Sequence, residues 1–275
     1  MRNNKKNFLA YFKLLLHFGY QEAMSCFFAV SILGMLMVTR YFPLPWLPRY
    51  DWLLIFCLLM QVAMVWILKM ETVDELKVIC LFHILGTSME LFKVHMGSWS
   101  YPGDAYSKLY GVPLYGGFMY ASVASYITQA WRRLSLQIEN FPTAPVNLVV
   151  GSLIYINFFS HHFMVDIRYL LLVAIVLLYW RTKVHFRVID QKFTMPLVMA
   201  FALTGFFIWV AENIATFLGA WQYPNQAHNW KLVHPGKVNA WLLLFIVSFL
   251  IVAQLKRIKA SRAGYQDFIN RSSPA

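Results

Sequence analysis

Long hydrophobic stretches follow one another along most of this 275-residue chain, with short polar segments between them. A membrane-spanning helix needs roughly 17–25 mainly apolar residues, and proline is best tolerated where a helix starts. Pro113, Pro145, Pro196 and Pro235 stand at or just before the starts of four such stretches. The pattern predicts an all-α, polytopic membrane helix bundle with about eight transmembrane helices. Their expected ranges are 22–39, 52–69, 75–95, 113–131, 145–163, 165–180, 196–218 and 238–254.

The composition is that of a membrane protein. Hydrophobic residues make up 59% of the chain and charged residues 13%, whereas soluble domains usually carry about 25% charged residues. Cys26, Cys57 and Cys80 lie in apolar stretches without a CxxC spacing, so we expect neither a disulfide framework nor a zinc site. The sequence contains no glycine-rich phosphate loop and no dinucleotide-binding fingerprint.

The basic residues are distributed unevenly between the two sides of the predicted spans. With the N-terminus inside, the inner segments carry 17 of the 24 Lys and Arg residues and the outer segments carry 7. This bias predicts that both termini are cytoplasmic, and it explains the net charge of +12 by topology and anionic lipid rather than by nucleic acid. Residues 1–21 are basic, and their short apolar part is interrupted by Lys13 and His17, so we interpret them as a retained cytoplasmic or interfacial segment.

One motif occurs twice, 122 residues apart: "ELFKVHMGSWSYP" at 90–102 and "ENIATFLGAWQYP" at 212–224. Four predicted spans fall in each half, and an even number of spans gives both halves the same orientation, so we predict two parallel four-helix repeats. The expected organisation is an N-terminal segment 1–21, a first repeat 22–133, a second repeat 134–254 and a basic cytoplasmic tail 255–275. The matching residues are Glu90, Gly97, Trp99, Tyr101 and Pro102 with Glu212, Gly219, Trp221, Tyr223 and Pro224.

Glu90 and Glu212 are the candidate catalytic residues. Each lies seven residues before its Gly, which places it roughly 10 Å along the helix from the turn. A carboxylate inside a bilayer costs about 2.5–3.5 kcal/mol on insertion scales, so it persists where it is paired, protonated or useful. A buried acid that holds its proton can deliver it to a substrate. The alternative is that each Glu makes an interhelical hydrogen bond that locks the two halves together.

The two acids differ in their neighbours along the helix. Lys93 and His83 share a helical face with Glu90, whereas Glu212 has no charged residue at the corresponding places. This predicts that Glu90 is the paired, ionised member and Glu212 the protonated acid. The aromatic residues of the two turns either line a site or belong to an interfacial aromatic belt. The candidate substrate-binding residues are Trp99, Tyr101, Trp221, Tyr223, Lys93 and His83.

Histidines gather near the predicted outer face. His161, His162 and Asp166 stand close together in the sequence, and His95, His228 and His234 are expected at the same side. Together with the two Glu residues they have the chemistry of metal ligands. However, the HxxxH and HxxHH boxes of membrane di-iron desaturases and hydroxylases are absent, so we interpret them as interfacial histidines and expect no metal and no cofactor.

At "ELFKVHMGSWSYP" followed by "YGVPLYGGFMYASVASYI" the chain resembles the family catalogued as domain of unknown function 817, which are bacterial multi-pass membrane proteins. The resemblance covers most of the chain and implies a location in the bacterial plasma (inner) membrane. More remotely, an intramembrane Glu, a Gly- and aromatic-rich turn and then Gly-Val-Pro look like the membrane carotenoid lycopene cyclases and hydratases. That resemblance implies cofactor-free acid catalysis on a polyene, with Glu90 and Glu212 as the matching acids.

Three possible functions remain from this reasoning. The first is an enzyme of the lyase or isomerase type, a cyclase or hydratase, in which Glu protonates a lipid-soluble, isoprenoid-like substrate that enters from the bilayer. The alternative is a small-molecule transporter or channel, which is supported by the parallel repeat and the intramembrane acids. A scaffold, partner subunit or sensor is the third possibility. The lipid bilayer is the expected partner in every case.

Overall fold

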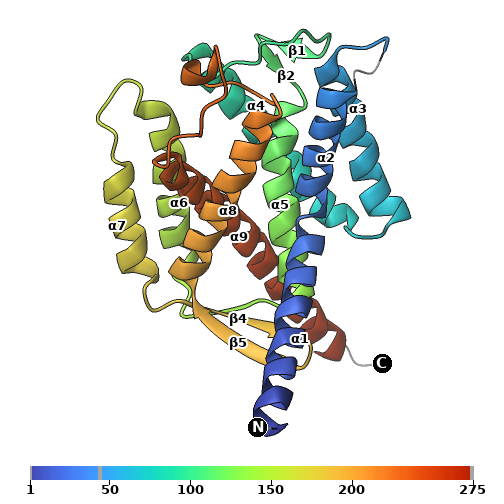
Figure 1. Cartoon of the computed structure of the whole chain (residues 1–275). Helices are drawn as coiled ribbons and strands as arrows, with labels where there is room; N and C mark the ends of the chain where they lie inside the picture. Colours follow the sequence, from blue (N-terminus) through green and yellow to red (C-terminus); the bar gives the residue numbers. More distant parts are fainter. Residues whose placement is uncertain (1, 43–44, 273–275) are drawn as a thin grey trace.

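The computed structural model describes residues 2–42 and 45–272, and most of them are helical (Figure 1). Seven of the eight predicted apolar stretches fall mainly on one helical segment, and 22–39 extends across the junction between two helices. A π-helical stretch, Ala63–Ile67, continues the third helix. The α-helices are α1 (Arg2–Ser25), α2 (Phe27–Tyr41), α3 (Arg49–Val62), α4 (Val73–His95), α5 (Gly116–Arg133), α6 (Ala144–Ser160), α7 (Arg168–Tyr179), α8 (Leu197–Phe217) and α9 (Lys237–Ser272).

Four helical segments of the described chain are long and apolar enough to cross a membrane, and a fifth qualifies if α1 and α2 are one bent span. α7 has 12 residues and is therefore about 18 Å long, against a hydrocarbon core of about 30 Å. α6 is also short, and α5 buries polar side chains such as Gln129. The structure thus shows four or five candidate spans where the sequence predicts eight. The four are Arg49–Ile67, Val73–His95, Leu197–Phe217 and Lys237–Lys259.

The N-terminal segment is a long helix that continues toward the first predicted span. α1 runs to Ser25, and the helix pair bends by 68° where α2 begins. The hydroxyl of Ser25 donates a hydrogen bond to the carbonyl oxygen of Gln21 at 2.8 Å, and such a bond to the preceding turn often bends a helix. No proline or glycine stands at this point, so the hydrophobic pattern alone does not predict the bend.

Two small antiparallel sheets correct the all-α prediction. β1 (Lys108–Leu109) pairs with β2 (Val112–Pro113). β3 (Gln137–Glu139), β4 (Lys183–Val188) and β5 (Gln191–Pro196) form a three-stranded sheet in that order.

The three-stranded sheet is fastened to the bundle by aromatic contacts. The ring of Phe186 stacks on that of Phe193 across β4 and β5 at 5.6 Å, and it lies 5.6 Å from the ring of Phe18 in α1. Exposed and half-buried positions alternate along most of β5. The basic residues of this segment hide the alternation in a hydropathy pattern, which is why the sequence predicts a polar loop there.

α5 lies inside the bundle and packs closely against α4 because two glycines remove side-chain bulk at their contact. A Cβ atom at Gly86 of α4 would lie 2.5 Å from Cγ of Tyr120, and one at Gly117 of α5 would lie 2.2 Å from Oγ1 of Thr87. Real Cβ atoms do not approach other atoms this closely, so both positions require glycine while the helices keep this spacing.

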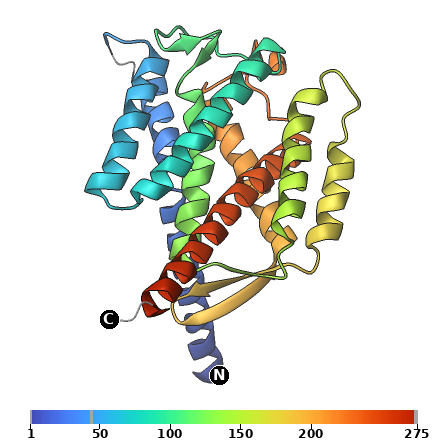
Figure 2. The same cartoon turned by 180° about the vertical axis from the view of Figure 1, so that it is seen from behind.

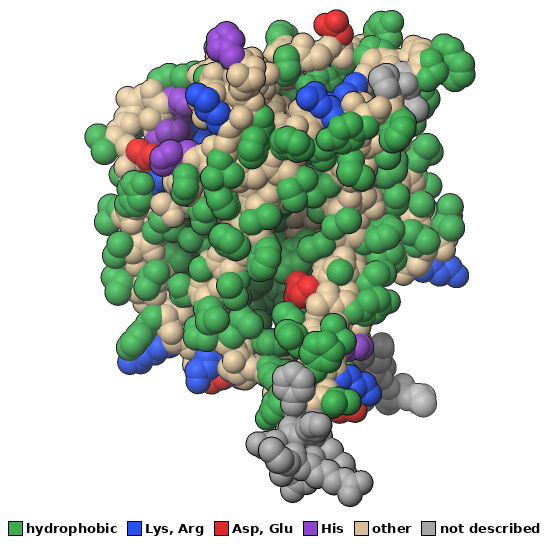
Figure 3. All heavy atoms as spheres, viewed as in Figure 1, with side chains coloured by type: hydrophobic (Ala, Val, Ile, Leu, Met, Phe, Trp, Pro, Cys, Tyr) green, Lys and Arg blue, Asp and Glu red, His purple; other side chains and the backbone are tan. Residues whose placement is uncertain are grey.

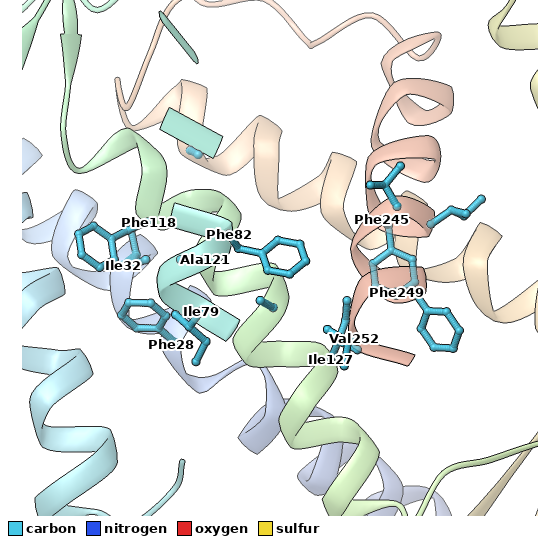
Figure 4. Close-up of a cluster of buried hydrophobic side chains, with 14 of the residues drawn as sticks. Phe28, Ile32, Ile79, Phe82, Phe118, Ala121, Ile127, Phe245, Phe249 and Val252 are labelled. Carbon is cyan, nitrogen blue, oxygen red and sulfur yellow. The ribbon is translucent and has the colours of Figure 1, made fainter. Parts of the chain in front are cut away.

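The hydrophobic core lies on both sides of α5. In Figure 4, Phe28 of α2 lies near Phe118 of α5, and the rings meet edge to face at 6.2 Å. Phe245 and Phe249 of α9 lie on the other side of the cluster, and their rings contact that of Phe201 in α8 at 6.0 and 5.1 Å. The core therefore joins the N-terminal helices to the C-terminal pair α8 and α9 through α5.

The two ends of the molecule are distinct. In Figures 1 and 2 the start of α1, the end of α9 and the three-stranded sheet lie at one end, and the turns after α4 and α8 lie at the other. Figure 3 shows hydrophobic side chains across the middle of one face, with Lys and Arg toward both ends and most visible His at the upper end. α9 continues as a helix to Ser272, whereas the sequence predicts a separate tail from residue 255.

The side chain of Arg49, at the start of α3, connects α2 to the turn after α8. Its guanidinium donates to the carbonyl oxygens of Leu218 (2.7 Å) and Gly219 (2.8 Å) after α8, and to that of Leu36 (2.9 Å) in α2. A planar guanidinium fits such a set of acceptors, whereas an apolar side chain leaves them without a donor. The chain therefore has a direct polar link between its N-terminal helices and the turn after α8.

Arg49→Met is expected to lower the free energy of unfolding by roughly 2–4 kcal/mol, because three carbonyl groups lose a charged donor at once. The measurement is thermal unfolding of the detergent-purified protein. Arg40→Met, a change in an exposed arginine of α2, is the matched control and should leave the midpoint nearly unchanged. Equal midpoints for the two variants would show that the link from Arg49 contributes nothing to stability.

Candidate functional site

The turns after α4 and α8 are built in the same way. Gly97 and Gly219 both have positive φ, 67° and 72°, a conformation that glycine adopts without strain. The amide of Ser98 donates to the carbonyl of Lys93, and the amide of Ala220 donates to that of Ala215, both at 2.9 Å. These are the hydrogen bonds of a Schellman helix end, and they explain why the motif has Gly at this place in both copies.

The two turns lie against each other. Ser100 and Gln222, which are equivalent positions 122 residues apart, exchange two backbone hydrogen bonds of 2.9 Å each. The rings of Trp99 and Tyr223 meet edge to face at 6.0 Å, and the ammonium of Lys237 stands 4.6 Å from the centre of the Tyr223 ring. The structure therefore brings together the two copies of the motif that the sequence places far apart.

Glu90 is enclosed by three neutral hydrogen-bond donors. Its side chain is buried, Oε2 accepts from the indole N–H of Trp99 and the hydroxyl of Tyr101, and Oε1 accepts from the hydroxyl of Tyr120 in α5. All three distances are 2.7 Å. The residues that the sequence selects as an aromatic lining thus hold the carboxyl group directly.

Glu212 has a similar but smaller set of partners. Its Oε1 accepts from the hydroxyl of Tyr223 at 2.5 Å, and its Oε2 accepts from the indole N–H of Trp241 in α9 at 2.6 Å. Tyr223 and Tyr101 hold equivalent places in the two motifs, eleven residues after their Glu. Each acid is therefore bound by the Tyr of its own turn and by an aromatic residue of the following helix.

The cationic neighbours differ from those expected along the helix. The ammonium of Lys93 lies 3.3 Å from Nε2 of His161 and 3.0 Å from Nε2 of His162, and it forms no ion pair with Glu90. The ring of His83 is tilted against that of Phe118, with the centroids 4.3 Å apart, and within the described residues no ion pair joins His83 to Glu90.

The prediction that Glu90 is ionised and Glu212 protonated was based on an ion pair between Lys93 and Glu90, and the structure, which describes both residues, does not show that pair. Helix spacing places Lys93 near Glu90, but it does not fix where a flexible side chain of four methylene groups ends. Conversely, Lys237 comes from α9 to lie beside Tyr223, the partner of Glu212. The donors to both acids are neutral, and Lys237 lies over the ring of one donor to each acid, 4.6 Å from that of Tyr223 and 5.7 Å from that of Trp99.

A chamber of about 110 Å³ lies between the two turns and the helix pairs. Glu90 reaches it, whereas Glu212 stands behind Tyr223 and Trp241, which do line it, and His83 is not among the lining residues. Lys237, Arg168 and His161 line it as well. The chamber therefore contains one of the two acids, several cations and a largely aromatic wall. The sequence-predicted residues in its lining are Glu90, Lys93, Trp99, Tyr101, Trp221 and Tyr223.

The residues of the chamber that were not predicted from the sequence include Tyr120, Trp241, Arg168 and Lys237. The first two carry a signal that could have found them, because Tyr120 is the fifth residue of α5 and Trp241 the fifth of α9. An aromatic residue thus stands at the same place in the helix after each motif. Arg168 and Lys237 lie outside any shared pattern, and only the fold brings them to the chamber.

The tyrosines of the two turns keep their phenol protons and act as hydrogen-bond donors. Burial, and then the neighbouring Glu90, raises the pKa of Tyr101 well above its ordinary value. Burial, and then Glu212, does the same for the pKa of Tyr223. Both phenols therefore keep their protons at neutral pH, so each can donate to a carboxylate oxygen or pass a proton along a hydrogen bond.

The histidines near the chamber do not form a metal-ligand cluster. Within the described residues, no group of three His, Cys, Asp or Glu side chains is arranged to hold a metal ion. Nδ1 of His161 donates a hydrogen bond to the carbonyl oxygen of Asn157 at 2.8 Å, and His95, His228 and His234 are exposed. Asp166 instead pairs with Arg168 at 2.7 Å.

A mostly helical chain whose described residues include four or five apolar helices of membrane-spanning length has the features of the class of integral membrane proteins. Comparison with known proteins identifies the group within that class. The family described as "Protein of unknown function (DUF817)" matches residues 14–249, and the chain belongs to this family.

A relative from Bacillus subtilis (strain 168), with the printed name "Uncharacterized protein YoaT", is 56% identical over 249 residues, which cover 90% of this chain and 93% of the relative. No solved structure matches the chain significantly. The family match confirms the resemblance to this family, and it covers most of the chain, as predicted from the sequence.

Proposed function

We propose that this protein is a cofactor-free enzyme of the bacterial plasma membrane, in which Glu90 acts as a general acid on a lipid-soluble, isoprenoid-like substrate. The observation that carries the proposal is the surroundings of Glu90. A buried carboxyl group with only neutral hydrogen-bond partners stands in the wall of an aromatic chamber. The three donors also suit the carboxylate, but the phenol of Tyr120 can reverse its hydrogen bond and accept from a protonated Glu90, so the site accommodates an acid that delivers its proton to a substrate.

The proposed reaction begins with proton transfer from Glu90 to one carbon of a substrate double bond, which leaves a carbocation on the neighbouring carbon. The cation then loses a proton from an adjacent carbon, or it binds water and loses a proton from that water. The Glu90 carboxylate accepts the proton, or Glu212 accepts it through the hydroxyl of Tyr223, in which case Glu212 then releases a proton to water and Glu90 takes one up. The faces of Trp99 and Trp221 are suited to stabilising the cation.

The proposed topology is that of eight helical crossings in two parallel repeats, 22–133 and 134–254, with both termini in the cytoplasm. Its support is the common construction of the turns after α4 and α8 and the pairing of Ser100 with Gln222. The short α7 would require local thinning of the bilayer, and Arg168 and Arg181 at its two ends have side chains long enough to reach the interface.

The experiment that tests the function is untargeted lipid analysis of bacterial cells with and without the gene for this protein. We expect one lipid to accumulate when the protein is absent. Its counterpart in cells with the protein should have the same mass, for an isomerisation or cyclisation, or a mass greater by one water molecule. Such a pair follows directly from protonation and quenching without a cofactor.

A different result would favour the transporter. If the lipids of the two strains are identical while the uptake or release of a polar solute changes, the protein moves that solute and the acids serve in transport. If the lipids are identical and the uptake and release of solutes are unchanged, the enzyme proposal is wrong. Glu90 and Glu212 then have a structural role, as hydrogen-bonded links between helices.

A further inference from the structure

A second cavity lies directly beside the chamber. It is a groove of about 620 Å³ between α4, α6 and α9, and its lining is almost entirely apolar. In Figure 2, α9 passes diagonally between α4 and α6. Volumes of this size are typical of small-molecule sites. The groove faces the region that the hydrophobic helices α4 and α9 would place inside the bilayer.

The chamber and the groove share one wall, which we call the partition and which consists of Met89, Tyr120 and Leu244. These three side chains form a small cluster of buried hydrophobic residues apart from the main core. The hydroxyl of Tyr120 touches Glu90 on the chamber side, whereas its ring faces the groove lining. A hydrocarbon chain of a ligand that lies in the groove would therefore reach the candidate acid once the partition moves.

The chamber has positive charge without enough negative charge to balance it. Lys93 is only 6% exposed, and its nearest polar contacts are two histidine nitrogens. Lys237 lies over the rings of Trp99 and Tyr223. Within the described chain, no carboxylate lies at ion-pair distance from Lys93 or Lys237, and Asp166 is taken up by Arg168.

A buried ammonium without a counter-ion is costly, so the group either loses its proton or gains a bound anion. The cations of the chamber stand at one end of a groove made for a hydrocarbon chain. We infer that the ligand of this site is an anionic lipid, with its charged head between Lys93 and Lys237 and its single apolar chain in the groove between α4 and α6. This inference rests on the proposed function and names the class of its substrate.

The test measures binding without turnover. The purified protein in zwitterionic phosphatidylcholine nanodiscs is titrated with farnesyl phosphate and with farnesol, and the tryptophan fluorescence of the chamber reports the occupancy. We expect farnesyl phosphate to bind at least about tenfold more tightly, because charge-assisted hydrogen bonds are stronger than neutral ones. Lys93→Met together with Lys237→Met should abolish this preference, whereas Lys231→Met, a change in an exposed outer lysine, should preserve it.

The groove is tested separately from the charged end. Ser152 lines the groove, while its neighbour Leu153 is exposed on α6 and does not line it. Ser152→Phe should weaken the binding of farnesyl phosphate at least about tenfold and leave isopentenyl phosphate unaffected, because the shorter chain does not need the groove. Leu153→Phe, which places the same ring on α6 outside the groove, should change neither affinity, and equal unfolding midpoints of the two variants verify that both are folded.

The outcomes distinguish this inference from the proposed function. Equal affinities for farnesyl phosphate and farnesol would overturn the anionic ligand, even if the lipid analysis still shows a conversion. Binding of inorganic phosphate as tight as that of farnesyl phosphate would remove the role of the groove. Charge-dependent and groove-dependent binding supports the inference even where cells show no lipid conversion, and in that case only the proposed reaction fails.

Discussion

Glu90→Gln is expected to lower the lipid conversion at least about 100-fold, which is the lower end of the contribution of a general acid. Glutamine has the same shape, and its carbonyl oxygen can still accept from Trp99 and Tyr101. Its amide group can donate to the hydroxyl oxygen of Tyr120, because a phenol accepts as well as donates. The substitution therefore removes the proton and keeps the packing, and the ratio of product to substrate lipid in cells measures the effect.

The comparison with the second acid makes this prediction specific. Glu212→Gln should reduce the conversion less, because Glu212 stands behind Tyr223 and does not reach the chamber. Glu139→Gln, a change in an exposed carboxylate of β3, should have no effect when protein amounts are matched. Equal losses for the variants at Glu90 and Glu212 would contradict the assignment of Glu90 as the acid. Full lipid conversion by the Glu90→Gln variant would show that this residue does not donate the proton.

Much of the candidate site could be predicted because its residues lie close together in the sequence, in a short motif. Gly97 and Gly219 mark two helix ends, and the fixed spacing from Glu to Gly and then to Tyr places both residues on one side of the turn. Tyr101 and Tyr223 therefore reach their own acids through a few residues of chain. Such contacts depend on local geometry, so the sequence pattern contains most of the information.

The parts that the sequence did not predict depend on distant segments. Lys237 reaches the partner of Glu212 from another helix, and Lys93 turns toward His162 at the end of α6. The groove exists only because α9 crosses between α4 and α6. Hydropathy likewise finds apolar segments but not their lengths as helices, which is why α7 was predicted as a span although it has 12 residues.

Gly86→Ala is expected to lower the free energy of unfolding by about 1–3 kcal/mol, the usual result of adding bulk to a well-packed contact. The added Cβ would lie 2.5–2.6 Å from Cβ, Cγ and Cδ2 of Tyr120. These atoms are at the base of the side chain, which cannot swing aside as a flexible end can, and the hydroxyl of the same ring is bound to Glu90. Either α4 and α5 separate, or Tyr120 leaves the acid, so stability and conversion should fall together.

A matched glycine and a double substitution separate this clash from the general effect of adding a methyl group. Gly34 lies in α2 with nothing within 4 Å of its added Cβ, so Gly34→Ala should be neutral or stabilising by roughly 0.5–1 kcal/mol. In a Tyr120→Ala background the ring is absent, and Gly86→Ala should then cost nothing further in thermal unfolding. If Gly86→Ala destabilises the protein equally with and without the Tyr120 ring, the close approach of α4 and α5 arises elsewhere, and Tyr120 is not held between that contact and Glu90.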